Sequence, residues 1–189
     1  MVKCLSAASA MDCGAVVSNG ARSAAVPLYQ TDFSFYYAGG LERISAAQPA
    51  TDARKSLYLA IDQMSRATRR TLSPATNQAA LALLKVKVGD FDGALEAIRR
   101  AEEADSHSYM SHMARSTLYL SQGDLENAIQ EFKASRALGA PEVNIAQLHS
   151  NLAAAVRKTN SSELWHSLTG EYPKRKPKTR HVTGEGKRP

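Results

Sequence analysis

The sequence predicts an all-α protein, a right-handed α-solenoid of about three antiparallel helix-turn-helix repeats. The first observation is a near repetition: "VGDFDGALEAIRRAEEAD" at residues 88–105 returns as "QGDLENAIQEFKASRALG" at 122–139, an offset of 34 residues (122 − 88 = 34). The second is that an apolar stretch with helical spacing precedes each copy, at 77–88 and 109–122. One such hairpin cannot bury its second face alone, and we therefore expect the units to stack.

A degenerate unit is expected before these two. The segment 55–72 fits the second helix of that unit, and Ser73-Pro74 ends its pattern. Its apolar face consists of Ala60, Ile61, Met64 and Ala67. The first helix of the unit is expected within 41–51, where Pro49 disturbs the helical spacing.

The two complete units share the chemistry of their turns. Gly89 and Gly123 can adopt the left-handed conformation that ends a helix, and Asp90 and Asp124 can cap the helix that follows. The buried face of the second helix is expected to comprise Ala94, Leu95, Ile98 and Ala101 in one unit, and Ala128, Ile129, Phe132 and Ser135 in the other. Small residues on this face allow the two helices of a hairpin to approach closely.

The array is expected to end in a long helix and a short one. Helical spacing over 142–160 places Ile145, Leu148, Leu152 and Val156 on one face. The segment "SELWHSLTGEY" at 162–172 predicts a short final helix. Terminal repeats are commonly atypical because one of their faces meets water.

The predicted organisation has three parts: an N-terminal arm at 1–40, a helical repeat domain at 41–170 and a basic, disordered tail at 171–189. The arm is expected either to be disordered or to cover a groove in the repeat domain. The tail is defined by charge, because residues 173–189 carry seven Lys or Arg and one Glu. The remaining residues carry 24 − 7 = 17 basic and 18 − 1 = 17 acidic side chains, so the net charge of +6 belongs to the tail.

The pattern over about residues 53–156 resembles the tetratricopeptide repeat family. The residues that carry the resemblance are Leu81, Ala82, Gly89-Asp90-Phe91, Ala94, Ile98 and Ala101, then Tyr119, Gly123-Asp124-Leu125, Ala128 and Phe132. The chain departs from the family at the Trp position, which is Gln78 in one unit and His112 in the next, and at the pair Arg115-Ser116.

This resemblance implies that a partner peptide lies in a concave groove lined by the first helix of each unit. The corresponding positions are Leu83, Val86, Lys87, Met110, Met113, Thr117, Leu120, Asn144, Gln147 and Asn151. Methionine side chains adapt to varied apolar shapes, and Asn and Gln can both donate and accept hydrogen bonds. The predicted function is therefore a non-catalytic scaffold or chaperone-like adaptor that binds a peptide or helix of another protein.

Two alternatives concern the same groove. A Met or Leu stripe at helical spacing is commonly core, and the aromatic-rich segment at 28–40 could itself fill the groove or form a homodimer contact. A repeat protein of this size is also similar to accessory subunits of secretion and pilus-assembly systems.

The basic tail suggests a further alternative. Lys174, Arg175, Lys176, Lys178 and Arg180 could neutralise phosphates of nucleic acid or of an anionic surface. The rival function is therefore a nucleic-acid or anionic-surface binder that acts through this tail.

Enzymatic chemistry is not expected. The five histidines form no metal-binding spacing, and neither a phosphate-binding Gly-rich loop nor a G-x-S-x-G motif occurs. Cys4 and Cys13 have the spacing of neither a redox pair nor a zinc site. We therefore expect no cofactor and no metal. The absence of a long apolar stretch excludes a transmembrane helix and favours a cytoplasmic protein, with an organelle-targeting N-terminus as the alternative.

Overall fold

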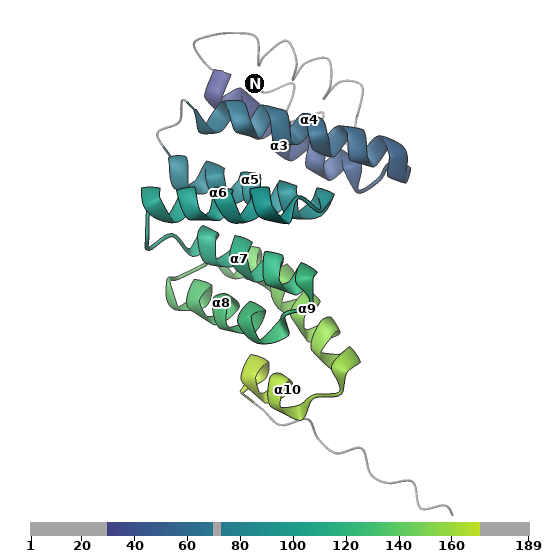
Figure 1. Cartoon of the computed structure of the whole chain (residues 1–189), viewed down its shortest axis with the longest axis vertical. Coiled ribbons are helices and arrows are strands. Elements are labelled where there is room, and N and C mark those ends of the chain that lie inside the picture. Colours follow the sequence, from purple (N-terminus) through teal and green to yellow (C-terminus); the bar gives the residue numbers. More distant parts are fainter. Residues whose placement is uncertain (1–29, 70–72, 171–189) are drawn as a thin grey trace, which may run out of the picture.

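The computed structural model describes residues 30–69 and 73–170, and these form eight helices and no strand. The helices are α3 (Gln30–Ser45), α4 (Ala50–Thr68), α5 (Pro74–Val88), α6 (Phe91–Ala104), α7 (Tyr109–Gln122), α8 (Leu125–Ala137), α9 (Glu142–Thr159) and α10 (Ser162–Thr169). Figure 1 shows them as an elongated array in chain order. The predicted all-α helical repeat solenoid is thus confirmed.

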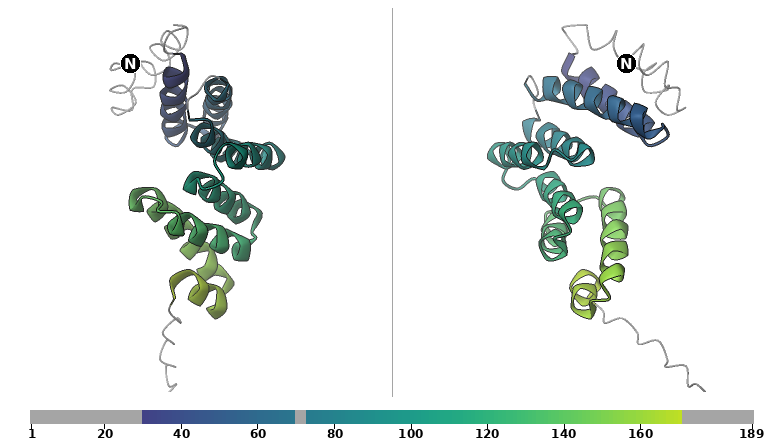
Figure 2. Two further views of the ribbon diagram at one scale, coloured as in Figure 1. Left: turned by 90° about the vertical axis from the view of Figure 1, so that its left-hand side faces the viewer. Right: turned by 45° about the vertical axis from the view of Figure 1, so that its right-hand side comes forward.

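The helices form antiparallel hairpins that stack on one another. The most extensive contacts join α3 to α4, α5 to α6 and α7 to α8 within their hairpins. Between hairpins, α5 packs against α4 and α7, whereas α9 contacts both α7 and α8 (Figure 2). The starts of α6 and α8 are 125 − 91 = 34 residues apart, which is the offset of the sequence repeat.

The turn chemistry predicted for the two complete units is confirmed. Gly89 and Gly123 end α5 and α7 with φ of 81° and 82°, a conformation that costs glycine no steric penalty. The Asp90 carboxylate accepts the Gly93 N–H at 3.0 Å, and the Asp124 carboxylate accepts the Asn127 N–H at 3.2 Å. Each aspartate therefore satisfies an N–H in the first turn of the helix that it caps.

The core consists of two clusters that meet at α7. The first cluster runs from α3 to α7, where it includes Ala114 and Leu118. The second cluster includes Met113 and continues through α8, α9 and α10. Met110 packs against both clusters. Helix α7 therefore belongs to both halves of the described structure.

The predicted boundary between arm and repeat domain, at residues 40 and 41, falls inside helix α3. Tyr37, Ala38, Leu41 and Ile44 are buried, and α3 packs along α4. The glycine pair at 39–40 disfavours a helix, but burial of this apolar face outweighs that cost. The first helix of the degenerate unit is thus α3, and Pro49 is the N-cap residue of α4.

The predicted faces of the other helices are confirmed except at two positions. In α4, Ala60, Met64 and Ala67 are buried, and in α9 all four predicted residues are buried. Ile61 is only half-buried, and Leu95 is 51% exposed although its counterpart Ile129 is fully buried. Ile129 belongs to the second core cluster, whereas Leu95 belongs to neither cluster.

The predicted short final helix is confirmed as α10, which the Ser161 hydroxyl caps by accepting the Leu164 N–H at 3.2 Å. Across residues 30–69 and 73–170, no helix has the length and apolar character needed to span a membrane.

Candidate functional site

The predicted groove positions lie on α5, α7 and α9, and eight of the ten reach the surface. We call these eight the first-helix surface: Leu83, Lys87, Met110, Thr117, Leu120, Asn144, Gln147 and Asn151. The four on α9 and the end of α5 (Lys87, Asn144, Gln147 and Asn151) are exposed, and the other four are half-buried. Val86 and Met113 are only 7% and 8% exposed, because they pack into the two core clusters. A ligand would therefore contact the first-helix surface and not Val86 or Met113.

The part of the first-helix surface on α5 and α7 is mainly apolar. Leu83 on α5 and Met110 on α7 both pack against the first core cluster, and α5 packs against α7. Thr117 donates its hydroxyl hydrogen to the Met113 carbonyl at 2.9 Å. Since that hydrogen is used within the helix, Thr117 offers its methyl group and oxygen lone pairs to a ligand.

The charge of Lys87 is neutralised by a residue on α3. The ammonium lies 2.5 Å from the Glu42 carboxylate, and the pair is partly exposed. Glu42 was missed in the sequence prediction because α3 was not expected to reach this surface. With Lys87 paired, this end of the first-helix surface carries little net charge.

The part of the surface on α9 is built of amides. Asn144 Nδ2 donates to the Tyr109 hydroxyl oxygen at 3.4 Å, which connects α9 to the start of α7. Gln147 Nε2 donates to Asn151 Oδ1 at 3.0 Å along one face of α9. Tyr109 was not among the predicted positions, although its place next to Met110 at the start of a first helix is a signal that could have found it. The amides and Tyr109 thus form a polar extension of the apolar surface.

The departures from the family pattern form a polar network on the other side of α7. Helical spacing places His112 and Arg115 opposite Met110 and Thr117. His112 Nδ1 lies 2.7 Å from Glu131 on α8, and Arg115 lies 2.5 Å from Glu102 on α6 and 4.0 Å from Glu131.

This network takes the place of aromatic packing. All four of its side chains are 20–29% exposed. Beside it, buried Ser116 donates to the Ala128 carbonyl at 2.7 Å. These polar contacts connect α6, α7 and α8, so they fix the relative positions of neighbouring repeats.

Two histidines of the described chain make contacts within the fold. His112 bonds Glu131, and His149 stacks on the Phe132 ring with centroids 5.6 Å apart. Within residues 30–69 and 73–170, no three His, Cys, Asp or Glu side chains come together as metal ligands would. The pKa of Asp90 is lowered by the Gly93 N–H and by the Lys85 ammonium, both of which stabilise its charged form; this is a helix cap and not a reactive carboxylate.

Several predicted features lie outside the described residues. These are the segment 1–29 of the N-terminal arm with Cys4 and Cys13, and the five anion-binding candidates at 174–180.

Comparison with known proteins addresses the repeats directly. Residues 79–142 match the profile of the tetratricopeptide repeat family, from the middle of α5 to the first residue of α9. Comparison with curated proteins and with solved structures finds no match. The matched segment contains both Gly-Asp turns and most of the two complete hairpins. Residues 79–142 therefore carry tetratricopeptide repeats, as the sequence pattern predicted.

Proposed function

We propose that this protein is a non-catalytic scaffold or chaperone-like adaptor that binds a peptide or helical segment of another protein on the first-helix surface. Tetratricopeptide repeats generally mediate protein–protein interactions, and the family is typically non-catalytic. The finer assignment, to this surface and to this mode of action, is ours.

The observation that carries the proposal is the exposed Gln147–Asn151 pair. Because Gln147 donates to Asn151, the pair still offers the Gln147 carbonyl oxygen as an acceptor and the Asn151 amide hydrogens as donors. A peptide backbone presents the complementary groups, one N–H and one C=O per residue. Both side chains are exposed on α9, so a partner segment can reach them without displacing a core residue.

The neighbouring apolar residues favour a partner segment with an apolar side chain. Met110 and Leu120 on α7 are half-buried, and Asn144 is bonded to Tyr109 across the α7–α9 joint. Burying the remaining apolar area of such side chains stabilises a complex by roughly 25 cal/mol per Å². Since Lys87 is already paired with Glu42, the surface does not require a strongly acidic partner.

Site-specific photo-crosslinking in the full-length protein tests the surface. A photoreactive residue replaces Gln147 on α9 in one sample, and replaces Gln130, which is exposed on the second helix α8, in the matched control. We expect a partner to be crosslinked from position 147 and not from position 130. Equal crosslinking from both positions would contradict the assignment of the surface.

Affinity for the crosslinked partner then tests the amides. The double substitution Gln147→Ala, Asn151→Ala should weaken binding about tenfold, the equivalent of two lost hydrogen bonds. Gln130→Ala should leave affinity unchanged, and circular dichroism should show equal helical content in all variants. If the double variant binds as tightly as the wild type, the amides do not contact the partner.

Neutralising the basic tail distinguishes the proposed function from the alternative function of binding nucleic acid or an anionic surface. Replacing the five cations of 174–180 with glutamine in the full chain should leave partner affinity on the first-helix surface unchanged. A loss of binding that scales steeply with salt would instead favour the anionic-surface function.

A further inference from the structure

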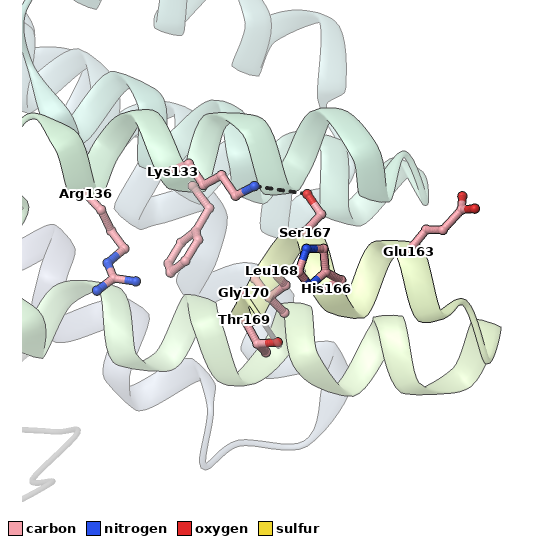
Figure 3. A pocket seen from close by; sticks show the side chains of 9 residues that line it. Lys133, Arg136, Glu163, His166, Ser167, Leu168, Thr169 and Gly170 are labelled. Carbon is pink, nitrogen blue, oxygen red and sulfur yellow. Dashed lines mark hydrogen bonds between the residues drawn. The ribbon is translucent and has the colours of Figure 1, made fainter. Parts of the chain in front are cut away.

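A pocket of about 640 Å³ lies between α8 and α10, away from the first-helix surface. Figure 3 shows Lys133 and Arg136 entering it from α8 and Ser167 and Leu168 from α10. Phe132 and Leu168 close its floor, where they are only 1% and 6% exposed because they belong to the second core cluster. The pocket thus places two cationic side chains at its rim over a floor that the core holds in position.

The Arg136 guanidinium is held beside the Phe132 ring. Its central carbon lies 6.0 Å from the centroid of the Phe132 ring, within the range of a cation–π contact. Such a contact leaves the N–H groups at the edge of the guanidinium free to bind a planar or tetrahedral anion in bidentate fashion. Arg136 therefore carries a charge that its contact with the Phe132 ring holds in position.

Lys133 connects the two helices across the pocket. Its ammonium donates to the Ser167 hydroxyl oxygen at 3.0 Å, which leaves two ammonium hydrogens and the Ser167 hydroxyl hydrogen to donate to a ligand (Figure 3). Within the described chain, neither Lys133 nor Arg136 is paired with a carboxylate. The one acidic residue that lines the pocket, Glu163, is turned away at the far end of α10 (Figure 3).

The position of Arg136 in the last turn of α8 has a common structural explanation. A cation at that place interacts favourably with the negative end of the helix dipole. That explanation covers Arg136 alone. It does not account for the Lys133–Ser167 bridge to α10.

We infer that this pocket binds a small organic anion through its carboxylate or phosphate group. Arg136, Lys133 and Ser167 would donate to that group. The inference is independent of the proposed partner surface, because it uses α8 and α10 and not the first-helix surface.

The test is a titration of the isotope-labelled full-length protein followed by nuclear magnetic resonance. The probes are hexanoate, hexyl phosphate and uncharged hexan-1-ol, and the signals observed are the backbone amides of Lys133, Ser167 and Gly170. We expect saturable shifts with at least one anion and not with the alcohol. The tighter of the two anions identifies the headgroup, carboxylate or phosphate, that the pocket accepts.

Single substitutions test whether the anion binds in the pocket or at exposed cations in general. Arg136→Gln and, independently, Lys133→Gln should each raise the dissociation constant about threefold to tenfold, as expected for loss of one partly exposed charge contact. The control Lys158→Gln removes an exposed cation of α9 and should change the dissociation constant by less than about twofold. The inference is overturned if neither anion saturates the pocket signals, if hexan-1-ol binds as well as the anions, or if the control weakens binding as much as Arg136→Gln.

Discussion

Replacing Asp90 with alanine should destabilise the protein by about 1–2 kcal/mol, because one carboxylate makes two contacts at the start of α6. It accepts the Gly93 N–H at 3.0 Å, and it lies 3.1 Å from the Lys85 ammonium. Loss of an N-cap side chain costs about 1 kcal/mol. The partly exposed ion pair adds roughly 0.2–1 kcal/mol.

The contribution of Asp90 should also depend on pH in a defined direction. The hydrogen bond from Gly93, and then the contact with Lys85, hold the pKa of Asp90 below its ordinary value of 3.8. A group with a lowered pKa in the folded state stabilises the fold at pH values above its unfolded pKa, and this stabilisation is lost as the pH falls through the folded pKa. Asp90→Asn keeps a capping oxygen but cannot titrate, so the stability difference between wild type and this variant should vanish in acid.

Urea denaturation followed by circular dichroism measures both effects, at neutral pH and in steps down to about pH 3. The matched comparison is Asp124→Ala, which removes the equivalent cap of α8, where the carboxylate accepts from Asn127 Nδ2 at 2.6 Å and contacts no lysine among the described residues. That variant should lose a similar amount of stability, but without a contribution from an ion pair that salt would screen. The reasoning fails if Asp90→Ala unfolds at the wild-type urea concentration, or if the difference between wild type and Asp90→Asn persists unchanged in acid.

Three other substitutions test packing and backbone conformation by the same unfolding assay. Gly123→Ala should lower the free energy of unfolding by about 1–2 kcal/mol, because φ is 82° at this position. Gly39→Ala should raise the free energy of unfolding by about 0.5–1 kcal/mol, because the site is helical and an added Cβ would meet nothing within 4 Å. Stabilisation by Gly123→Ala together with destabilisation by Gly39→Ala would contradict this account. Phe132→Ala should cost about 3–5 kcal/mol through the cavity left by a side chain that is 1% exposed, and a loss below 1 kcal/mol would show that the second core cluster collapses around the gap. Arg115→Met should cost about 1.5–3 kcal/mol by leaving its two glutamates without their cation, and a loss that is the same at high and low salt would argue against an ionic origin.

Local chemistry that recurs in the sequence could be predicted residue by residue. The Gly-Asp turns were predicted because a left-handed C-cap and a side-chain N-cap each require particular residues at fixed places. Helix α3 could not be predicted in the same way. Its glycines at 39–40 disfavour a helix, and the packing of Tyr37 and Leu41 that offsets them is a tertiary contact with no local signal.

Which face of a helix remains open was predictable only in part. Leu83 and Val86 lie less than one turn apart, and so do Met110 and Met113, yet one of each pair is half-buried and the other is buried. Helical spacing defines an apolar stripe, but the angle at which the next repeat packs decides which edge of that stripe is covered. Leu95 shows the same limit, because it is exposed although its sequence counterpart Ile129 is buried in the second core cluster.

The sharing of α7 between the two core clusters has a consequence for folding cooperativity. Ala114 and Leu118 on one side of α7, and Met113 on the other, mean that neither half of the array can unfold without exposing apolar surface of this helix to water. In repeat proteins, such contacts between neighbours couple units that would otherwise unfold separately. Backbone amides of α7 should therefore exchange with solvent deuterium more slowly than those of α4 or α10, in the order set by the free energy needed to open each segment.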